Sequence, residues 1–452
     1  MPILMTLELL VEWVDNTPSY NFQVVEWDKF REELARRLLE MPEPGTLDTV
    51  SNYENMVSSL TCILQETISV AVPKSRPSPH SKRWWNKELD TLKKKKNKLR
   101  SLSYKFRALA DHPSHKEHRR IWRDYSSAIT KAKQEHWASF LEGLSFTDVW
   151  TANRYISGDG SDGGKTRILM LTLQPSNTEE VPTVASANKD KSAMLMSLMF
   201  PNRPSDSPMF PGVYEDQLPP PVEITEGQIR RHITNLNPYK VPGIDGIPNI
   251  VLKRSADYII PYLLQIFQAM LKMGVYAGQW KEIMTCVLRK PGKPRYNIPK
   301  AYQPVVLVNT IAKLLSSIVA KDIVHLTEAH SLLPANHFGG RPGRTMSDSL
   351  HLLVDTVKAA WWCKQVVSTL FLDIEGAFPN AVTDRLLHNL RKQRIPERYV
   401  VFVSSMLTGR RNRLKFDDYL SEWFHLDNVI VQGDPLSMIL YLYYNADLLD
   451  IA

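Results

Sequence analysis

The sequence predicts an α+β fold, with a helical N-terminal half followed by a C-terminal half in which short strands and helices mix. Helical apolar spacing and a run of cations dominate the region before residue 155. After residue 223, short apolar runs that end in Gly- and Pro-rich turns alternate with amphipathic helical patterns. The 452 residues, of which 43% are hydrophobic, suffice for two or three domains with apolar cores.

The composition excludes several protein classes. Cys62, Cys286 and Cys363 lie far apart, without the spacing of a disulfide framework or a zinc site, which favours a reducing compartment. No stretch approaches the roughly 18 uninterrupted apolar residues of a membrane span. The N-terminus carries acidic residues where a secretion signal carries basic ones. We therefore expect an intracellular protein, in the nucleus or cytoplasm, with no membrane partner.

Residues 1–80 mix short helical patterns with polar turns. In WDKFREELARRLLEM, the apolar residues Phe30, Leu34 and Leu38 recur at helical spacing. This region is predicted to be a small helical connector.

Residues 81–155 concentrate the positive charge. Between Lys82 and Lys133 there are 17 Lys and Arg against 5 Asp and Glu, a balance of +12, so the rest of a chain whose net charge is +8 carries −4. The block is helical in character, and cations beside stacking aromatics suit a nucleic-acid backbone. The same pattern fits a solvated basic hairpin whose aromatics are its packing stripe. The cations that we single out are Lys93, Lys94, Lys95 and Lys96, and the aromatics are Trp84, Trp85, Tyr104, Phe106, Trp122 and Tyr125.

Residues 156–222 are predicted to be linkers around a poorly defined middle. YISGDGSDGGKTRI is rich in Gly and Ser, and the stretch from Pro201 to Pro221 is rich in Pro and weakly periodic. Neither pattern predicts a packed element.

A helix and a loop open the ordered region at residue 223. In ITEGQIRRHITNLNP, Thr225 and Gln228 have the spacing of a capping box. Ile229, Ile233 and Leu236 then mark one helix face. The loop NPYKVPGIDGIPNIVLK is dense in Gly and Pro, which allows a backbone to approach a ligand closely but is equally typical of ordinary turns.

A basic turn follows the next apolar run. MTCVLRKPGKP places Lys290 and Lys293 after a short predicted strand. AYQPVVLVNTIAKLLSSIVAKDI is then predicted as an extended segment that leads into a helix. A basic turn between two strands can hold a triphosphate.

The Gly-rich turn HFGGRPGR carries Arg341 and Arg344 before a predicted helix, which Thr345 or Ser347 would cap. Guanidinium and backbone N–H groups at a helix start favour an anion, whereas the alternative is an ordinary loop with solvated arginines. The residues of this helix expected to face inward are Leu350, Leu353, Val354 and Val357.

The run VVSTLFLDIEGAFPNAV places a carboxylate at the end of an apolar segment. Val366 to Leu372 is predicted to be a short buried strand that ends on Asp373. A carboxylate in that position costs desolvation energy unless it pairs or binds a cation, so metal binding is a natural role for it. By local chemistry alone, an Asp that caps the next helix is the commoner outcome.

The last helix is predicted to be buried. In VIVQGDPLSMILYLYYNADLLDIA, Asp434 can cap free N–H groups and Pro435 suits the first helical position. The helix is apolar almost all round, which is typical of burial inside a larger body. Its apolar residues include Leu436, Ile439, Leu440, Leu442 and Tyr443.

Six segments, taken in order, resemble the reverse transcriptases of non-LTR (LINE-like) retrotransposons. They cover about residues 220–452 and are NPYKVPGIDGIPNIVLK, LRKPGK, AYQPVVLVNTIAKLL, HFGGRPGRTMSDSLHLL, FLDIEGAFPNAV and VQGDPLSMILYLYYNADLL. The resemblance implies the fingers of a right-hand polymerase over 223–360 and an incomplete palm over 361–452. More faintly, YNFQVVEWDKFREEL and KRWWNKELDTLKKKKNKLR look like the connector that such elements carry after an endonuclease, which has no counterpart here.

The resemblance implies a metal-dependent reaction. Asp373 would be the catalytic, metal-binding aspartate, and the backbone carbonyl of Ile374 would hold the same ion. The implied cofactor is Mg2+ (or Mn2+), with two ions in the complete site of the family. The implied partners are an RNA template, a DNA primer and a dNTP.

Other residues match the nucleotide and template contacts of the family. Phe378 would lie under the incoming sugar, and Lys290 would lie near the phosphates. Gln432 and Gly433 would form the turn against the sugar and base of the nucleotide. The residues implied as template or backbone contacts are Arg341 and Arg344.

Departures from the family pattern lead us to expect a truncated copy that is inactive alone. The family carries an adjacent Asp pair on a hairpin after the last helix, and Asp447 and Asp450 on that helix are poor substitutes. Gln303 replaces an arginine expected to clamp the triphosphate, which turns a bidentate cationic contact into a neutral one. The alternatives are a noncatalytic nucleic-acid-binding remnant and a chain that never folds stably. Further departures are His337, Gly340 and Val431.

Overall fold

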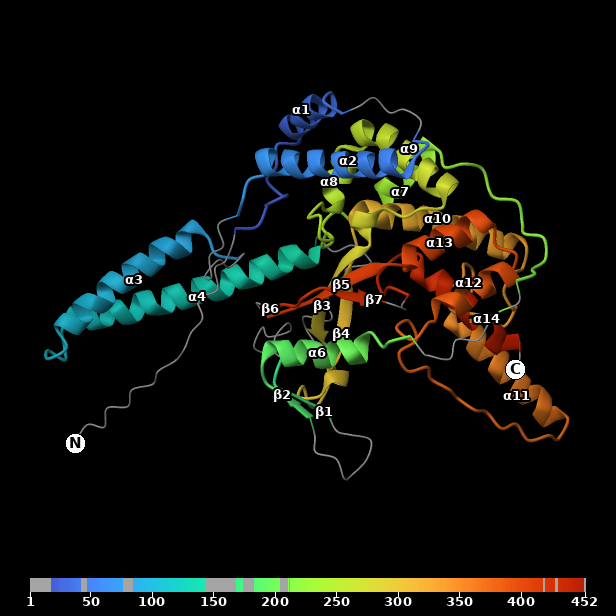
Figure 1. Cartoon of the computed structure of the whole chain (residues 1–452). Helices are drawn as coiled ribbons and strands as arrows, with labels where there is room; N and C mark the ends of the chain where they lie inside the picture. Colours follow the sequence, from blue (N-terminus) through green and yellow to red (C-terminus); the bar gives the residue numbers. More distant parts are fainter. Residues whose placement is uncertain are drawn as a thin grey trace. The chain divides into compact units, whose positions relative to one another are not determined.

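The computed structural model describes residues 18–41, 47–75, 84–142, 168–173, 183–203, 210, 212–417, 419–426 and 430–450, without the side chains of 139–142 and 449–450. The chain divides into two compact units (Figure 1). The first comprises residues 1–20 and 74–164, and the second comprises residues 21–73 and 165–452.

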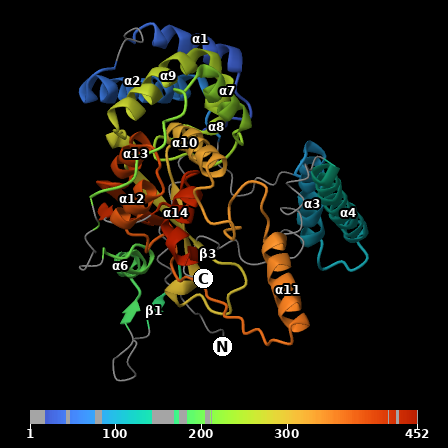
Figure 2. The same cartoon turned by 90° about the vertical axis from the view of Figure 1, so that its right-hand side faces the viewer.

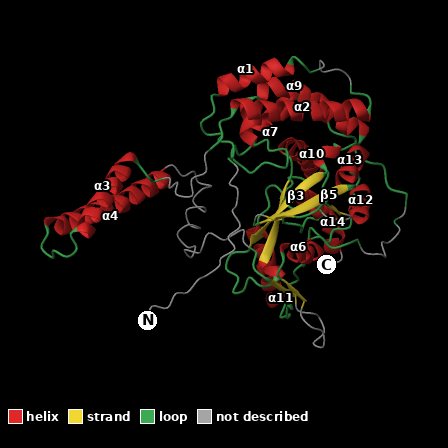
Figure 3. Cartoon of the chain, turned by 60° about the vertical axis from the view of Figure 1, so that its left-hand side comes forward, coloured by secondary structure: helices red, strands yellow, loops and turns green. Residues whose placement is uncertain are grey.

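The first unit is built on a hairpin of two long helices. Helix α3 (Lys87–Lys105) and helix α4 (Pro113–Glu142) lie side by side along their length (Figure 3). Asn86 begins α3 by accepting a hydrogen bond from the backbone N–H of Leu89 at 2.9 Å. The predicted helical character of this basic region is therefore observed. Its described buried residues are few, namely Leu89, Ser114, Ile121 and Ala132.

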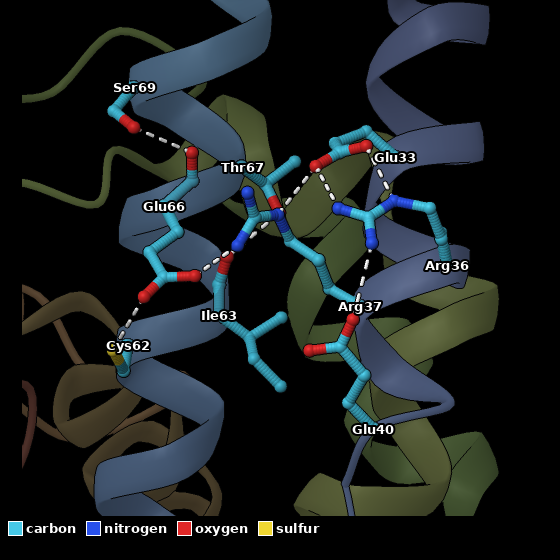
Figure 4. A network of polar contacts seen from close by, with 9 residues as sticks. All are labelled: Glu33, Arg36, Arg37, Glu40, Cys62, Ile63, Glu66, Thr67 and Ser69. Carbon is cyan, nitrogen blue, oxygen red and sulfur yellow. Dashed lines mark hydrogen bonds and ion pairs between the residues drawn. The ribbon is translucent and has the colours of Figure 1, made fainter.

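Two N-terminal helices belong to the second unit. In α1 (Trp27–Leu38), the predicted apolar residues Phe30, Leu34 and Leu38 are buried. Helix α2 (Val50–Ala71) packs against α1 and also against α9 (Ala256–Met273). Glu33 of α1 accepts hydrogen bonds from Arg36 and Arg37, which lower its pKa to about 2, and Arg37 also pairs with Glu66 of α2 (Figure 4).

A mixed sheet lies at the centre of the second unit, in the order β4-β3-β5-β6, with β7 also paired to β5. The β3–β4 pair is antiparallel, with Cys286 opposite Val305. The β3–β5 pair is parallel, with Met284 opposite Arg413. The other two pairs are antiparallel. The strands are β3 (Glu282–Arg289), β4 (Tyr302–Leu307), β5 (Arg410–Phe416), β6 (Tyr419–Leu420) and β7 (Phe424–Leu426).

The last helix, α14 (Ser437–Asp450), is buried as predicted. It packs against α12 and α10, and Leu440 and Tyr443 are fully buried. The hydroxyl groups of Tyr443 and Thr327 lie 2.7 Å apart, and Asn389 Nδ2 donates to the carbonyl of Tyr443 at 3.0 Å. The other described helices of the second unit include α7 (Glu226–Asn235), α8 (Asn249–Arg254), α10 (Thr310–Ala329), α12 (Thr383–Lys392), α13 (Glu397–Leu407) and the short 3-10 helices η1 (Gly278–Trp280) and η2 (Pro299–Ala301).

Part of the predicted linker 156–222 is packed. Strands β1 (Leu171–Leu173) and β2 (Thr183–Ala185) pair, and α6 (Asn188–Met199) buries Leu195. The end of the Pro-rich stretch is tied to α13 and to the turn before it, because Leu218 N–H donates to Arg394 O at 2.9 Å and Arg398 donates to Pro221 O at 2.8 Å. The sequence signals missed these contacts because their partners lie about 180 residues further along the chain. Most of YISGDGSDGGKTRI lies outside the described residues.

Two predictions between residues 345 and 374 are wrong. Helix α11 (Met346–Trp362) has the predicted Thr345 cap, but none of its residues is buried, and Leu350 and Val354 are 56% and 46% exposed. Figure 2 shows α11 set apart from α12 and α14. The predicted buried strand is an exposed loop, in which Val366 is 94% and Phe371 is 80% exposed. An apolar run becomes a strand only where neighbouring strands accept its hydrogen bonds, and no described residue does so here.

None of the described helices is both long and apolar enough to span a membrane.

We predict that the packing of α14 supports the second unit. Leu440→Ala should lower the free energy of unfolding by about 2–5 kcal/mol, because it leaves a cavity in a fully buried position. Leu448→Ala, on the same helix but 53% exposed, is the matched control and should change it by no more than about 0.5 kcal/mol. Urea denaturation measures both, and equal losses would show that α14 is not packed as described.

Candidate functional site

Strand β4 forms the floor of the candidate site. The basic turn begins at one end of the β3–β4 pair, where the backbone N–H of Lys290 donates to Ala301 O at 2.8 Å. At the other end, a Cβ on Gly433 would lie 3.3 Å from the carbonyl oxygen of Val306. Gln303 lies between them on β4 and is half-buried. The β4 strand therefore connects the basic turn to the Gln432–Gly433 turn.

The loop that contains Phe378 crosses the same region. The backbone N–H of Ile430 donates to Phe378 O at 3.2 Å, and the ring of Phe378 lies 5.0 Å from that of Tyr441 on α14. Three residues earlier, Glu375 pairs with Lys300 at 2.7 Å, just before β4. The structure thus brings Phe378 and the Gln432–Gly433 turn together.

The Gln432–Gly433 turn is exposed above a buried anchor. Gln432 and Gly433 are exposed, and Gly433 has φ +106°, a backbone conformation that favours glycine. Asp434, only 6% exposed, accepts hydrogen bonds from Leu436 N–H at 2.9 Å and from Ser316 Oγ at 3.1 Å. Burial raises the pKa of Asp434, against the opposing effects of these bonds and of Arg410 and Lys313. The predicted capping role of Asp434 is confirmed.

Asp373 and Ile374 lie in the exposed loop that replaces the predicted strand. Ile374 is 46% exposed, and Asp373 is exposed as well. Within the part of the chain that the structure describes, no group of three or more His, Cys, Asp or Glu residues could hold a metal ion. Asp447 is occupied elsewhere, since ion pairs with Lys392 and Arg385 overcome the effect of burial and lower its pKa. The side chain of Asp450 lies outside the described residues.

Arg341 and Arg344 make contacts within the protein, and their role as template contacts stays a prediction. The side chain of Arg341 is 2% exposed and makes a two-pronged ion pair with Glu328, at 2.8 and 3.0 Å. It also donates to Pro334 O at 2.7 Å. Arg344 is half-buried and donates to Ala335 O. The sequence could not predict the ion pair of Arg341, because the carboxylate of Glu328 lies on α10, outside the Gly-rich turn.

The Gly- and Pro-rich loop 237–248 approaches α10 closely rather than an open surface. A Cβ on Gly243 would lie 2.4 Å from Asn309 Oδ1, so only glycine fits. Thr310 Oγ1 donates to Ile247 O at 2.6 Å. Burial raises the pKa of Asp245 to about 6, and Lys313 of α10 acts against that rise.

The four lysines singled out on the basic hairpin of the first unit fall into two pairs. Lys93 lies over the ring of Trp85, 5.4 Å from its centroid, and Lys96 lies over Tyr125 at 4.7 Å. The rings of Trp85 and Tyr125 also contact each other at 6.5 Å. Lys94 and Lys95 are exposed. Some aromatics of the hairpin form a packing stripe, while Trp122 and Tyr104 remain 55% and 67% exposed, and nucleic-acid binding by this region stays a prediction.

Sequence reasoning missed the buried cations beneath the Gln432–Gly433 turn. Arg410 is 3% exposed at the start of β5, and Lys313 is half-buried on α10. The strand signal in the sequence is weak here, because the first four residues of RRNRLKF are polar. Its first apolar residue is Leu414, which is buried. Only the alternation of buried and exposed positions identifies Arg410 as the inward arginine.

Comparison with known proteins gives a family for the C-terminal region. Residues 288–451 match the family described as reverse transcriptase (RNA-dependent DNA polymerase). The matched region runs from the end of β3 to α14 and contains every residue proposed above for the nucleotide and the metal. The basic hairpin lies outside it.

Similar proteins come from mobile elements of fruit flies. The chain is 32% identical over 232 residues to a "Probable RNA-directed DNA polymerase from transposon X-element" of Drosophila melanogaster, which covers 50% of this chain and 24% of that protein. It is 24% identical over 390 residues to a 115 kDa protein of the type-1 retrotransposable element R1DM of the same species, covering 84% of this chain and 36% of that protein. It is 25% identical over 225 residues to an RNA-directed DNA polymerase from mobile element jockey of Drosophila funebris, covering 50% and 24%. The chain thus spans about a quarter to a third of the length of these relatives.

We predict that Arg341 matters for stability and Arg344 much less. Arg341→Ala should lower the free energy of unfolding by about 2–4 kcal/mol, because it leaves Glu328 without its ion-pair partner. Arg344→Ala should cost less than about 1 kcal/mol, since it removes one exposed hydrogen bond. Chemical denaturation of both variants decides the matter. Loss of nucleic-acid binding by Arg341→Ala at unchanged stability would restore the template role.

Proposed function

We propose that residues 288–451 act as a reverse transcriptase domain of the non-LTR retrotransposon kind. This domain binds a dNTP along β4 and, in the complete polymerase, takes part in copying an RNA template onto a DNA primer. Residues 223–360 correspond to fingers and 361–452 to part of a palm. Residues 1–80 are the connector, 81–155 the basic nucleic-acid-binding region and 156–222 the segment that joins them.

The contact between the Gln432–Gly433 turn and the Phe378 loop carries this proposal. The hydrogen bond from Ile430 to Phe378 O and the close approach of Gly433 to Val306 O bring two distant segments onto one strand. Phe378 then lies under the sugar, and Gln432 and Gly433 meet the sugar and base. Lys290 reaches the phosphates, with Gln303 as a neutral neighbour in place of an arginine.

The reverse transcriptase family generally uses divalent metal ions, and here the described residues do not fit a two-ion centre. Asp373 and the carbonyl of Ile374 are the ligands that the chain offers for Mg2+ or Mn2+, and both lie in an exposed loop. Two ions need several carboxylates at close range, and the described residues hold no such group. We therefore propose that this chain alone binds nucleotide without turning it over.

A second candidate function is nucleic-acid binding by the basic hairpin without catalysis. The observation that favours it is that Lys94 and Lys95 are exposed on the same helical hairpin as the exposed rings of Tyr104 and Trp122. Exposed cations beside exposed aromatics suit phosphates and unstacked bases. Asp373→Ala should leave such binding unchanged.

We predict nucleotide binding without primer extension. The wild-type chain, with Mg2+ or Mn2+, an RNA template and an annealed DNA primer, should extend the primer no more than a blank. It should still bind dNTP, and Gly433→Ala should weaken that binding about tenfold, because a methyl group strains a backbone at φ +106° and crowds Val306 O.

The matched control for this prediction is Gly409→Ala. Gly409 is also in the left-handed region, at φ +69°, but a Cβ there meets no described atom within 4 Å. Gly409→Ala should strain a backbone with positive φ, though less than at +106°, without the loss of nucleotide affinity. Clear primer extension by the wild-type chain would refute the claim of inactivity, and a chain that binds no dNTP would refute the proposed site.

For the basic hairpin, we predict that the two lysine pairs behave differently. Lys94→Gln with Lys95→Gln should reduce the slope of log affinity against log salt by about 1.4, since each lost contact with a single-strand phosphate removes about 0.7. Lys93→Gln with Lys96→Gln should change the slope less and lower the melting temperature, because these side chains cover Trp85 and Tyr125. Titration of single-stranded RNA at several salt concentrations measures the slopes. Binding that does not depend on salt, or equal slopes for the two double variants, would remove this function.

A further inference from the structure

We propose that Asp434 is a positioning residue, which holds the Gln432–Gly433 turn in place for the nucleotide from a buried polar cluster. We define the Asp434 cluster as Asp434, Ser316, Lys313, Arg410 and Tyr276. This inference rests on the proposed function. It adds which residues hold the Gln432–Gly433 turn in position.

Both carboxylate oxygens of Asp434 are used to fix the turn. Oδ1 accepts from the backbone N–H of Leu436 at 2.9 Å, which ties the turn to the start of α14. Oδ2 accepts from Ser316 Oγ at 3.1 Å, which ties it to the middle of α10. The backbone adds to this arrangement, because Ser437 N–H donates to Asp434 O at 3.1 Å and Ser437 Oγ donates to Val431 O. A single side chain thus joins the turn to two helices.

The turn is held from both sides. Gly433 lies so close to β4 that an added Cβ would be 3.3 Å from Val306 O. Ser316 on α10 holds the neighbouring Asp434 from the other direction. Gln432 itself remains exposed, while Asp434 two residues later is 6% exposed. The exposed part of the turn is therefore placed by buried contacts rather than by contacts of its own.

Charge explains why an ionisable residue can be buried at this position. Arg410 of β5, itself 3% exposed, and Lys313 of α10 both favour the ionised form of Asp434, against the cost of burial. Arg410 Nε donates to Met406 O at 2.6 Å, so its guanidinium is fixed in the interior. Two cations from separate elements thus face the carboxylate. Lys313 also faces Asp245 of the loop 237–248, with Lys240 nearby.

The cluster lowers the stability of the fold, because it buries polar atoms without partners in the described part of the chain. A simple helix cap would not require this. Among the described side chains, Arg410 Nη1 and Tyr276 Oη are buried without a hydrogen-bond partner. Buried polar groups without partners cost stability, and a cap alone needs neither of them. Local rules of this kind are broken chiefly at functional sites. The Asp434 cluster lies next to the turn that the nucleotide would contact. We infer that its function is to hold this turn in place.

Hydrogen–deuterium exchange of the full chain tests the proposal with and without dNTP and Mg2+. Without nucleotide, Asp434→Ala should speed the exchange of amides 431–437 about tenfold, because both side-chain anchors are lost. Asp434→Asn should restore most of the protection, since an amide oxygen still accepts from Leu436 N–H and its NH2 group can donate to Ser316 Oγ. Ser316→Ala should have a smaller effect in the same direction. With nucleotide, Asp434→Ala should weaken dNTP binding about tenfold and Asp434→Asn much less.

The matched control is Asp322→Ala. Asp322 is also shielded from solvent and accepts a hydrogen bond from Tyr399 at 2.9 Å, but it joins α10 to α13 away from the turn. It should leave the exchange of 431–437 unchanged even if it lowers overall stability. If Asp434→Ala does not fold, the exchange of 431–437 in Ser316→Ala decides the question.

Unchanged exchange of 431–437 in Asp434→Ala, or in Ser316→Ala if the first variant is unfolded, would overturn the positioning role. The positioning role would also be overturned if Asp434→Asn restored neither the protection of amides 431–437 from exchange nor the affinity for dNTP. A wild-type chain that shows no nucleotide-dependent protection would instead overturn the proposed function, while the comparison of variants without nucleotide would still report on the anchor.

Discussion

The double pairing of β3 is the constraint on which the candidate site depends. Its antiparallel partner β4 carries the floor of the site, and its parallel partner β5 begins with Arg410, which lies beneath the turn. Because β3 holds both strands in register, residues from distant parts of the sequence meet along β4. Helices α10 and α14 then close the arrangement through Ser316 and Asp434. The position of the Gln432–Gly433 turn relative to β4 and Arg410 therefore depends on the register of β3 with its two partner strands.

Much of the fold could be predicted because its signals are local. The capping box at Thr225, the cap by Thr345 and the burial of the apolar helix α14 follow from patterns of neighbouring residues, and the structure contains all three. The strand predicted before Asp373 and the inward face predicted for α11 both depend on partners that no local pattern specifies, and both are wrong. The Pro-rich stretch shows the converse, since distant contacts with α13 and the turn before it fix a segment that resembles a linker.

The order of the short motifs along the chain predicted more of the site residues than the local chemistry of each motif did. That order placed Phe378 and the Gln432–Gly433 turn in one site, and the structure brings them together through the hydrogen bond from Ile430. It also placed Arg341 on a template, whereas the guanidinium is buried against Glu328. Arg410 and Lys313 could not be found from the sequence, because the side of a strand or helix that faces the core depends on packing. The proposed function separates nucleotide binding from phosphoryl transfer, because transfer needs more carboxylates than the described residues bring together near Asp373.

Photoaffinity labelling tests the central claim most directly. A dNTP analogue with a photoreactive base, irradiated with the full chain and Mg2+, should attach to peptides that contain residues 288–306, 372–380 and 430–437, and an excess of unmodified dNTP should suppress the labelling. Labelling confined to residues 84–142, or labelling that unmodified dNTP does not suppress, would contradict the assignment of the β4 floor as a nucleotide site.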